Sequence, residues 1–220
     1  MSQTFSIDIH DGSVLRNRID LLNTFKDFYP QAKISLFFIP YDYELEMSPS
    51  FSLTRKQKLD WLHKNSDWIE IIPHGLIHIF GEFSGCDKQT METYIGTVGD
   101  ELKKDGLNSV EGFCAPNWLW TKEVVEALNE AKWWGAVDRN QPEMIRPTRY
   151  YEYTHSFTEP FYLDDGLEHI ALHGHMTGPS DNDLEACFTN LFKIPRDAEF
   201  KFVSEIIKEE NAKKGTRTTE

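Results

Sequence analysis

Two histidines four residues apart, His74 and His78, directly follow a short apolar run that ends at Pro73. On a helix both imidazoles would share a face, and one nitrogen of each could reach a single metal ion at roughly 2 Å. A catalytic metal site also needs a third protein ligand and an open position, and a carboxylate is a common third ligand. Asp11, near the start of the chain, can supply that carboxylate. The sequence therefore predicts a divalent metal site at Asp11, His74 and His78.

Other reactive side chains also come directly after apolar runs. Asp8 and His10 belong to the first run, where their alternation places them on the same side of a strand. His173 and His175 follow a late run, and the glycine between them suggests a close approach of another group. The quieter interpretations are that Asp11-Gly12 is a turn and that the histidines are polar loop residues. The shared position at run ends favours a functional site.

The elements that must hold these residues alternate along the chain. Apolar runs predict strands at residues 5–9, 33–39, 68–72, 110–114, 134–137 and 169–172. Amphipathic segments predict helices at residues 14–28, 54–65, 88–104, 122–131 and 181–191. This order predicts an α/β fold with mainly parallel strands, in which reactive residues collect at the carboxyl ends of the strands. We expect one domain over residues 1–210 and a disordered polar tail over residues 211–220.

Composition limits the classes of function. The chain has 220 residues, 40% hydrophobic residues and a formal net charge of −13, which argues against a nucleic-acid partner and against an anionic membrane surface. Three widely spaced cysteines suggest neither a disulfide framework nor a cysteine zinc site. No leader or long apolar stretch is recognisable, so a cytoplasmic protein is expected, although a processed chain would look the same. The oligomeric state stays open.

Four segments resemble the motifs of one known family, the polysaccharide deacetylases of the NodB-homology group, also called carbohydrate esterase family four. Residues 9–12, Ile-His-Asp-Gly, resemble the Phe-Asp-Asp-Gly motif; residues 74–78 resemble His-(Ser/Thr)-x-x-His; residues 112–118 resemble the Arg-x-Pro motif; and residues 170–173 resemble the late Leu-x-His motif. Residues 33–40 are similar to the second strand of the family, and residues 200–207 to its closing strand and helix. The likeness runs over nearly the whole chain in the expected order.

This resemblance implies a distorted (β/α) barrel of the NodB-homology type with a zinc-like ion on the three predicted ligands. The ion would activate water, and His173 would protonate the departing amine as general acid. The backbone N–H of Asn117 would stabilise the oxyanion, with Trp118 and His175 beside the substrate. The implied reaction removes an N-acyl group, typically acetyl, from an amino sugar, a sugar conjugate or an oligosaccharide.

The chain departs from the family pattern at two positions. His10 stands where an aspartate base is usual, so the base is His10 or Asp8, unless His10 joins the metal. Cys114 replaces the family arginine, and Arg139 is a candidate to rebuild the lost ion pair, although a surface pair with Asp138 is the more common role. Two further functions therefore stay open: hydrolysis of another C–N amide bond, and a non-catalytic carbohydrate-binding barrel.

Overall fold

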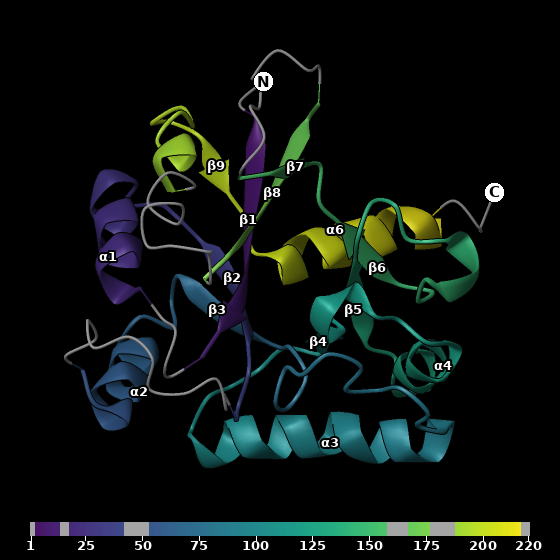
Figure 1. The fold of residues 1–220 in the computed structure, drawn as a ribbon. Coiled ribbons are helices and arrows are strands. Elements are labelled where there is room, and N and C mark those ends of the chain that lie inside the picture. Colours follow the sequence, from purple (N-terminus) through teal and green to yellow (C-terminus); the bar gives the residue numbers. More distant parts are fainter. Residues whose placement is uncertain (1–2, 14–17, 42–52, 158–166, 177–187, 217–220) are drawn as a thin grey trace.

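The computed structural model describes residues 3–13, 18–41, 53–157, 167–176 and 188–216 (Figure 1). Its strands are β1 (Thr4–Gly12), β2 (Ile34–Phe38), β3 (Ile69–Pro73), β4 (Gly112–Phe113), β5 (Trp134–Val137), β6 (Tyr150–Glu152), β7 (His155–Ser156), β8 (His169–His175) and β9 (Glu199–Phe200). Its helices are α1 (Ile19–Phe28), α2 (Arg55–Lys64), α3 (Lys88–Lys104), α4 (Lys122–Ala131) and α6 (Val203–Thr216), with short 3₁₀ turns at Pro116–Trp118 and Glu143–Ile145.

All strand pairs among the described residues are parallel, and they form two sheets. One sheet has the order β3-β2-β1-β8-β7, with β9 beside the first residues of β1, and the other has the order β4-β5-β6. The sheets meet where Val110 N–H donates to Ile71 at 3.0 Å and Cys114 N–H donates to Pro73 at 3.1 Å. The protein is therefore a distorted (β/α) barrel. The alternation of elements predicted the parallel α/β fold, and the family resemblance implied the barrel.

Helices surround the strands, with α1 and α2 beside β1 to β3, α3 along one edge and α4 outside β4 and β5 (Figure 1). Their first turns are fixed by local chemistry, because Thr54 and Gln57 form a capping box on α2, Asp87 caps α3 and Thr121 caps α4. The bounds of α3 and α4 are those expected from the sequence. These caps set where each helix begins and so where the preceding loop ends.

Strand β1 is buried on both faces, and its alternation separates two environments. Phe5, Ile7 and Ile9 belong to the large apolar cluster that also contains Leu22 and Phe25 of α1. The alternate residues of β1, Ser6, Asp8 and His10, are buried polar side chains. They share the barrel interior with the apolar residues of a smaller cluster: Phe37, Ile72, Trp134, Ala136, Tyr151 and Val203. The interior is therefore mixed, with polar groups concentrated on β1.

A buried glutamate joins α6 to the barrel. Glu70 of β3 accepts hydrogen bonds from the hydroxyl and N–H of Ser204 at 2.6 and 3.1 Å, and from the hydroxyl of Ser35 at 2.6 Å. Burial raises the pKa of Glu70 above its ordinary value, although the donors from Ser204 and Ser35 oppose that rise. The glutamate thus occupies the N-terminal end of α6, where a carboxylate interacts favourably with the helix dipole.

We expect Glu70→Gln to remove a pH dependence of stability. A carboxyl group whose pKa is raised by folding stabilises the native state below its unfolded pKa, near 4.5 here, and this contribution is lost as the pH rises through the folded pKa. Urea unfolding of parent and variant above pH 4.5 should give a difference in unfolding free energy that declines by up to about 1.4 kcal/mol per pH unit. The exposed Glu168→Gln is the control, and a constant difference for Glu70→Gln contradicts the prediction.

Several elements differ from the sequence-based expectation. The strands β6 and β7 were not predicted because they have only two or three residues each. Helix α6 extends to Thr216, so the prediction of disorder is wrong for residues 211–216. Of the helices predicted over residues 14–28 and 181–191, residues 14–17 and 181–187 lie outside the described part. Among the described residues, no helix combines the length and apolar character needed to cross a bilayer.

Candidate active site

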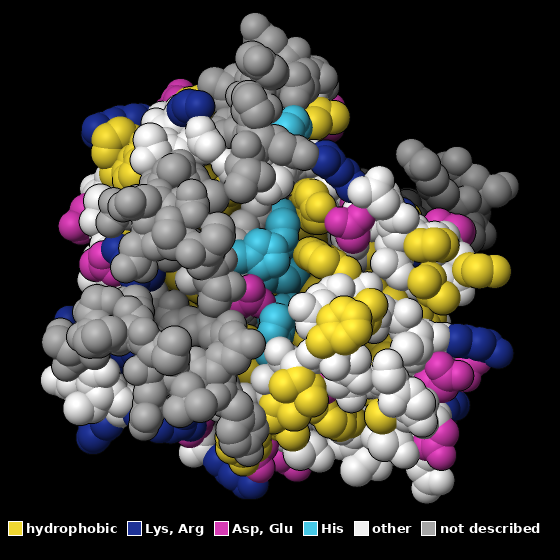
Figure 2. All heavy atoms as spheres, viewed as in Figure 1, with side chains coloured by type: hydrophobic (Ala, Val, Ile, Leu, Met, Phe, Trp, Pro, Cys, Tyr) yellow, Lys and Arg dark blue, Asp and Glu magenta, His cyan; other side chains and the backbone are white. Residues whose placement is uncertain are grey.

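A pocket of about 350 Å³ opens at the carboxyl ends of the strands. In Figure 2 histidine side chains gather in a hollow at the centre of the face, next to an acidic side chain. The pocket is lined by His10, Asp11, His74, His78, Asn117, Trp118 and His175. These residues come from the ends of β1, β3 and β8 and from the turn after β4, so strands that are distant in sequence supply one site.

Three predicted metal ligands converge at this pocket. Oδ1 of Asp11 lies 3.3 Å from Nε2 of His74 and 2.9 Å from Nε2 of His78. One ligand atom from each of the three residues lies within 4.8 Å of the others. The expectation that a helix brings the histidines together is wrong, because residues 74–79 form a loop and His78 adopts φ +55°.

The hydrogen bonds of His74 indicate that a cation fits between these groups. Its Nδ1 lies 3.1 Å from the carbonyl oxygen of Cys114, which can only accept. Burial lowers the pKa of His74, so a neutral ring places its single hydrogen on Nδ1. Its Nε2 then presents a lone pair to a carboxylate oxygen of Asp11, and two electron-rich atoms at 3.3 Å are favourable when a cation lies between them. The donor set therefore suits a divalent ion such as zinc.

Glu82, a residue that the sequence analysis missed, shapes the loop that carries His78. Its Oε1 accepts from the N–H groups of Leu76 and Ile77 at 2.7 and 3.1 Å, and its Oε2 accepts from that of His78 at 2.8 Å. The hydroxyl of Tyr94 on α3 also donates to this carboxylate. One carboxylate thus binds three consecutive backbone donors. Sequence motifs do not reveal this arrangement, because the contacts are made with backbone N–H groups, which every residue type except proline carries.

We expect Glu82→Gln to weaken metal binding about 10- to 100-fold without removing any ligand. The amide can keep one acceptor oxygen but places an NH₂ group against backbone donors, so the loop loses the conformation that directs His78 towards Asp11. Calorimetric titration of the metal-free protein with Zn²⁺ measures the change. Glu92→Gln on the exposed side of α3 is the control, and equal affinities for the two variants would contradict the prediction.

A second cluster lies beneath the pocket wall. The parallel register of β1 and β8 pairs Asp8 with His173, and Nδ1 of His173 lies 2.6 Å from Oδ2 of Asp8. Both residues are at least 96% buried, at 1% and 4% exposed, and neither lines the pocket. Burial alone raises the pKa of Asp8, but His173 and His10 beside it lower that pKa by more, so the carboxylate stays ionised.

His175 connects this buried pair to the predicted metal ligands. Its Nε2 lies 3.0 Å from Nε2 of His173, and its Nδ1 lies 3.1 Å from Oδ2 of Asp11. His173 and His175 therefore form a continuous bridge of contacts between the carboxylates of Asp8 and Asp11, both of which only accept.

His10 is the third buried histidine of the site. Its ring stacks on Phe37 at 4.1 Å between centroids and lies 4.9 Å from the ring of Trp118. Its Nε2 is 3.2 Å from Oδ2 of Asp8, without hydrogen-bond geometry to any described group. Burial is the main cause that lowers the pKa of His10 well below its ordinary value, followed by His173. A neutral His10 therefore stands at the pocket wall.

Backbone strain is concentrated at the pocket. Of the five described non-glycine residues with positive φ, four are pocket residues: Asp11, His78, Asn117 and Trp118, with φ between 55° and 59°. Such conformations cost on the order of 1 kcal/mol or more for residues with a β-carbon, and they persist where surrounding structure enforces them. The strain indicates that this backbone conformation is maintained because it directs the side chains of these four residues into the pocket.

The other residues considered from the sequence have structural roles. Cys114 is fully buried and burial raises the pKa of its thiol, which agrees with a small core residue. Arg139 lies over the ring of Tyr153, whose hydroxyl donates to Asp138 at 2.7 Å, whereas Asp8 interacts with His173, His10 and Tyr151. The close approach expected at Gly174 is to a side chain, since an added β-carbon would lie 2.1 Å from the ring of Phe157.

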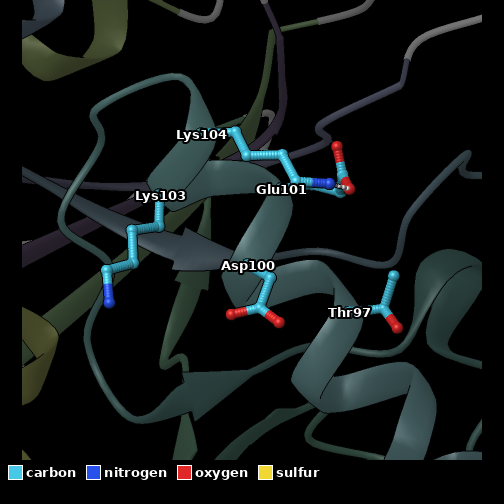
Figure 3. Close-up of a pocket in the computed structure, with 5 residues that line it drawn as sticks. All are labelled: Thr97, Asp100, Glu101, Lys103 and Lys104. Atoms are coloured by element: carbon cyan, nitrogen blue, oxygen red, sulfur yellow. Dashed lines mark hydrogen bonds and ion pairs between the residues drawn. The ribbon is translucent and has the colours of Figure 1, made fainter.

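A hollow outside the site lies along α3, lined by Thr97, Asp100, Glu101, Lys103 and Lys104 (Figure 3). Lys104 reaches towards Glu101 and pairs with it, as Figure 3 shows. Tyr41 also donates to Glu101. The residues of this hollow all lie on one helix, whereas the pocket at the strand ends combines buried imidazoles and carboxylates from several elements. We therefore take the strand-end pocket as the candidate active site.

Comparison with solved structures shows the same fold over almost the entire chain. A Mycobacterium smegmatis protein named as a polysaccharide deacetylase matches with a TM-score of 0.64 at 12% sequence identity, over 97% of this chain and 91% of that one. The chain has the fold of the carbohydrate esterase family 4 deacetylases. No protein-family model and no curated protein matches the sequence itself.

Two further structures with this deacetylase fold bear on the site. A family 4 acetyl xylan esterase from Clostridium thermocellum, in complex with a cobalt ion, matches with a TM-score of 0.57 at 10% identity over 95% of this chain and 92% of that one. A family 4 pseudoenzyme from Bacillus anthracis matches with a TM-score of 0.55 at 11% identity over 94% and 66%. The deacetylase fold thus occurs in a protein with a bound metal ion and in one described as a pseudoenzyme.

Proposed function

We propose that this protein is a metal-dependent hydrolase that removes an N-acyl group from an amino sugar, a sugar conjugate or an oligosaccharide. The observation that carries the proposal is the convergence of Asp11, His74 and His78, with the Nε2 lone pair of His74 directed at a carboxylate oxygen. The deacetylase fold and the cobalt complex of one protein with that fold support it. A divalent ion held there supplies Lewis acidity and lowers the pKa of water, which is the chemistry that hydrolysis of an acyl group needs.

The residues around the ligands would orient the acyl group. Asn117 and Trp118 line the pocket on the turn after β4, opposite the histidines of β1 and β8. We assign the backbone N–H of Asn117 to the developing negative charge on the acyl oxygen. The half-buried ring of Trp118 packs on His10, and its exposed part offers an apolar surface for a sugar ring.

Two groups would move protons. His10 is neutral and reaches the pocket wall, so we assign it the removal of a proton from the attacking water, with Asp8 as the alternative. We assign His173, with His175 between it and the pocket, the delivery of a proton to the departing amine. His173 is held by Asp8 on its far side, and His175 reaches the pocket, so the proton passes between them. Hydrolysis of the amide then gives a carboxylic acid and an amine.

Acetate release from a panel of acetylated sugars tests the proposal. The panel contains N-acetylglucosamine, its β-1,4-linked oligosaccharides, and an O-acetylated xylo-oligosaccharide as the ester comparison, with Zn²⁺ and Co²⁺ supplied separately. We expect about one divalent ion per chain by elemental analysis and release of acetate from an N-acetyl substrate. Release from the ester alone would overturn the assignment to N-acyl groups, while a protein that binds no ion would overturn the metal-dependent mechanism.

A carbohydrate-binding barrel is the second candidate. Asp8 and His173 lie beneath the pocket wall instead of lining it, and a pseudoenzyme shares the fold. This alternative predicts a bound ion and saturable binding of N-acetylated oligosaccharides, measured by calorimetry, without acetate release from any member of the panel. Turnover by the parent protein that is lost in His74→Ala excludes it.

A further inference from the structure

A buried tyrosine connects the two sheets to the acidic group beneath the pocket. Tyr151 belongs to β6 of the three-stranded sheet and is 4% exposed. Its hydroxyl lies 3.1 Å from Oδ1 of Asp8 and 3.0 Å from Oγ of Ser6, both on β1 of the other sheet. The phenol therefore crosses the barrel interior, although it lines no part of the candidate pocket.

The contacts continue to the opposite end of the barrel. Oγ of Ser6 lies 2.8 Å from Nε2 of His169, which begins β8 and is half-buried. His169 and His173 share one face of β8, as Ser6 and Asp8 share one face of β1, because alternate residues of a strand point the same way. The four residues His169, Ser6, Tyr151 and Asp8 thus form a continuous chain that runs up to His173.

The chemistry of these groups fixes the direction of each hydrogen bond. Asp8 is ionised and only accepts. Burial raises the pKa of Tyr151 well above its ordinary value, so its hydroxyl keeps its hydrogen and donates it to Asp8. The hydroxyl of Ser6 then donates to the oxygen of Tyr151, and Ser6 accepts from Nε2–H of His169. Every donor in the chain points towards Asp8.

Both oxygens of Asp8 are consequently occupied. Oδ1 accepts from Tyr151, and Oδ2 accepts from Nδ1–H of His173 at 2.6 Å. A carboxylate held at both oxygens cannot rotate freely, and a fixed Oδ2 keeps the hydrogen of His173 on Nδ1. Nε2 of His173 is then always the atom that faces His175 and the pocket.

We propose that Tyr151, held by Ser6 and His169, is a positioning residue that fixes Asp8 and thereby keeps His173 in a single tautomer and orientation. The kinetic consequence rests on the proposed hydrolase function, whereas the effect on His173 does not. Because Tyr151 acts through Asp8 and does not reach the pocket, its loss lowers kcat and leaves KM nearly unchanged.

Nitrogen-15 NMR of histidine-labelled, metal-free protein tests the positioning directly. The signals of His173 are assigned by their absence from His173→Gln. We expect Nδ1–H as the main tautomer in the parent protein, and in Tyr151→Phe a mixture of tautomers with at least about tenfold faster exchange of the Nδ1 proton with solvent. Tyr29→Phe is the matched control, since Tyr29 is also a buried tyrosine with a donating hydroxyl, but its acceptors are the carbonyls of Leu191 and Ile194.

Kinetics on the acetylated substrate with the highest turnover supply the second measurement. Loss of a hydrogen bond to a charged group should lower kcat about 10- to 100-fold in Tyr151→Phe, and several-fold in Ser6→Ala. Adding Ser6→Ala to Tyr151→Phe should cost nothing further, because Ser6 acts through the tyrosine hydroxyl. If Tyr151→Phe does not fold, Ser6→Ala carries both measurements.

The outcomes separate this inference from the proposed function. An unchanged tautomer and exchange rate of His173 in Tyr151→Phe and Ser6→Ala overturn the positioning role, as does a loss of kcat no larger than that of Tyr29→Phe. A changed His173 signal in a protein that releases acetate from no substrate would support the positioning role and reject the hydrolase proposal.

Discussion

Replacing Asp11 by asparagine is expected to weaken binding of Zn²⁺ by at least about 100-fold and to reduce acetate release to background. Asp11 is the carboxylate that His74 and His78 both face, and its Oδ1 lies within 3.3 Å of each Nε2. Burial by itself raises the pKa of Asp11, but contacts with His175, His74 and His78 lower it well below its ordinary value. The site therefore holds a full negative charge that the isosteric amide removes while filling the same space.

The ion gives this prediction a readout that does not depend on turnover. An ion that binds only the folded state stabilises the parent protein by about 2.7 kcal/mol at 100 times Kd, so Zn²⁺ should raise the Tm of the parent. Asp11→Asn should lose this increase. Asp87→Asn is the matched control, because Asp87 caps α3 outside the pocket and asparagine also caps helices. An Asp11→Asn variant that retains one ion per chain after dialysis would falsify the assignment of this ligand.

Asp8→Asn is expected to lower kcat by about 10³- to 10⁴-fold while the metal content stays unchanged, the size expected when a histidine loses the carboxylate that sets its tautomer. Two donors converge on Asp8, Nδ1–H of His173 and the hydroxyl of Tyr151. An asparagine offers one acceptor and an NH₂ group, so it cannot accept from both, and His173 is driven to the other tautomer. Steady-state kinetics at measured metal content check the result.

A matched control for Asp8→Asn lies in the same barrel. Asp138 accepts from the hydroxyl of Tyr153 at 2.7 Å, as Asp8 accepts from Tyr151, but its other oxygen accepts from the N–H of Asn140 at 2.7 Å and not from a histidine. Asp138→Asn should change kcat by less than about threefold. Comparison with His10→Gln at equal metal content distinguishes the two candidate bases. If Asp8→Asn lowers kcat no more than Asp138→Asn does, while His10→Gln lowers it strongly, the role of Asp8 is rejected.

The alternation of apolar runs and amphipathic segments was enough to predict a parallel α/β fold, because parallel strands buried on both faces leave apolar segments in the sequence. The barrel was implied only by the family resemblance. Longer elements with caps, such as α3 and α4, were predicted to the residue. The short strand β6 was missed, since three residues carry no periodic signal. The helical extension to Thr216 was missed for another reason: polar residues that form a helix turn resemble disorder in composition.

The candidate site was predicted unevenly. The position of Asp11, His74 and His78 after apolar runs correctly placed them together, because parallel strands end at the same edge. Glu82 and Tyr151 could not be found in the same way. Glu82 acts through backbone donors of its own loop, and Tyr151 acts across the barrel from a strand of another sheet, so neither has a partner at a recognisable sequence spacing. Packing between distant strands decides the contact of Tyr151, and the local backbone conformation decides those of Glu82.

The residues with positive φ around the pocket oppose the stability of the protein to its function. Glycine adopts positive φ without the penalty that a β-carbon brings, so Asn117→Gly or Trp118→Gly would relieve on the order of 1 kcal/mol of strain each, offset in part by the greater freedom of glycine in the unfolded chain. The same exchanges would delete a side chain from the pocket lining. Variants selected only for thermal stability would therefore accumulate glycine at these positions. The most stable variants would be those that had lost the pocket side chains needed for ligand binding.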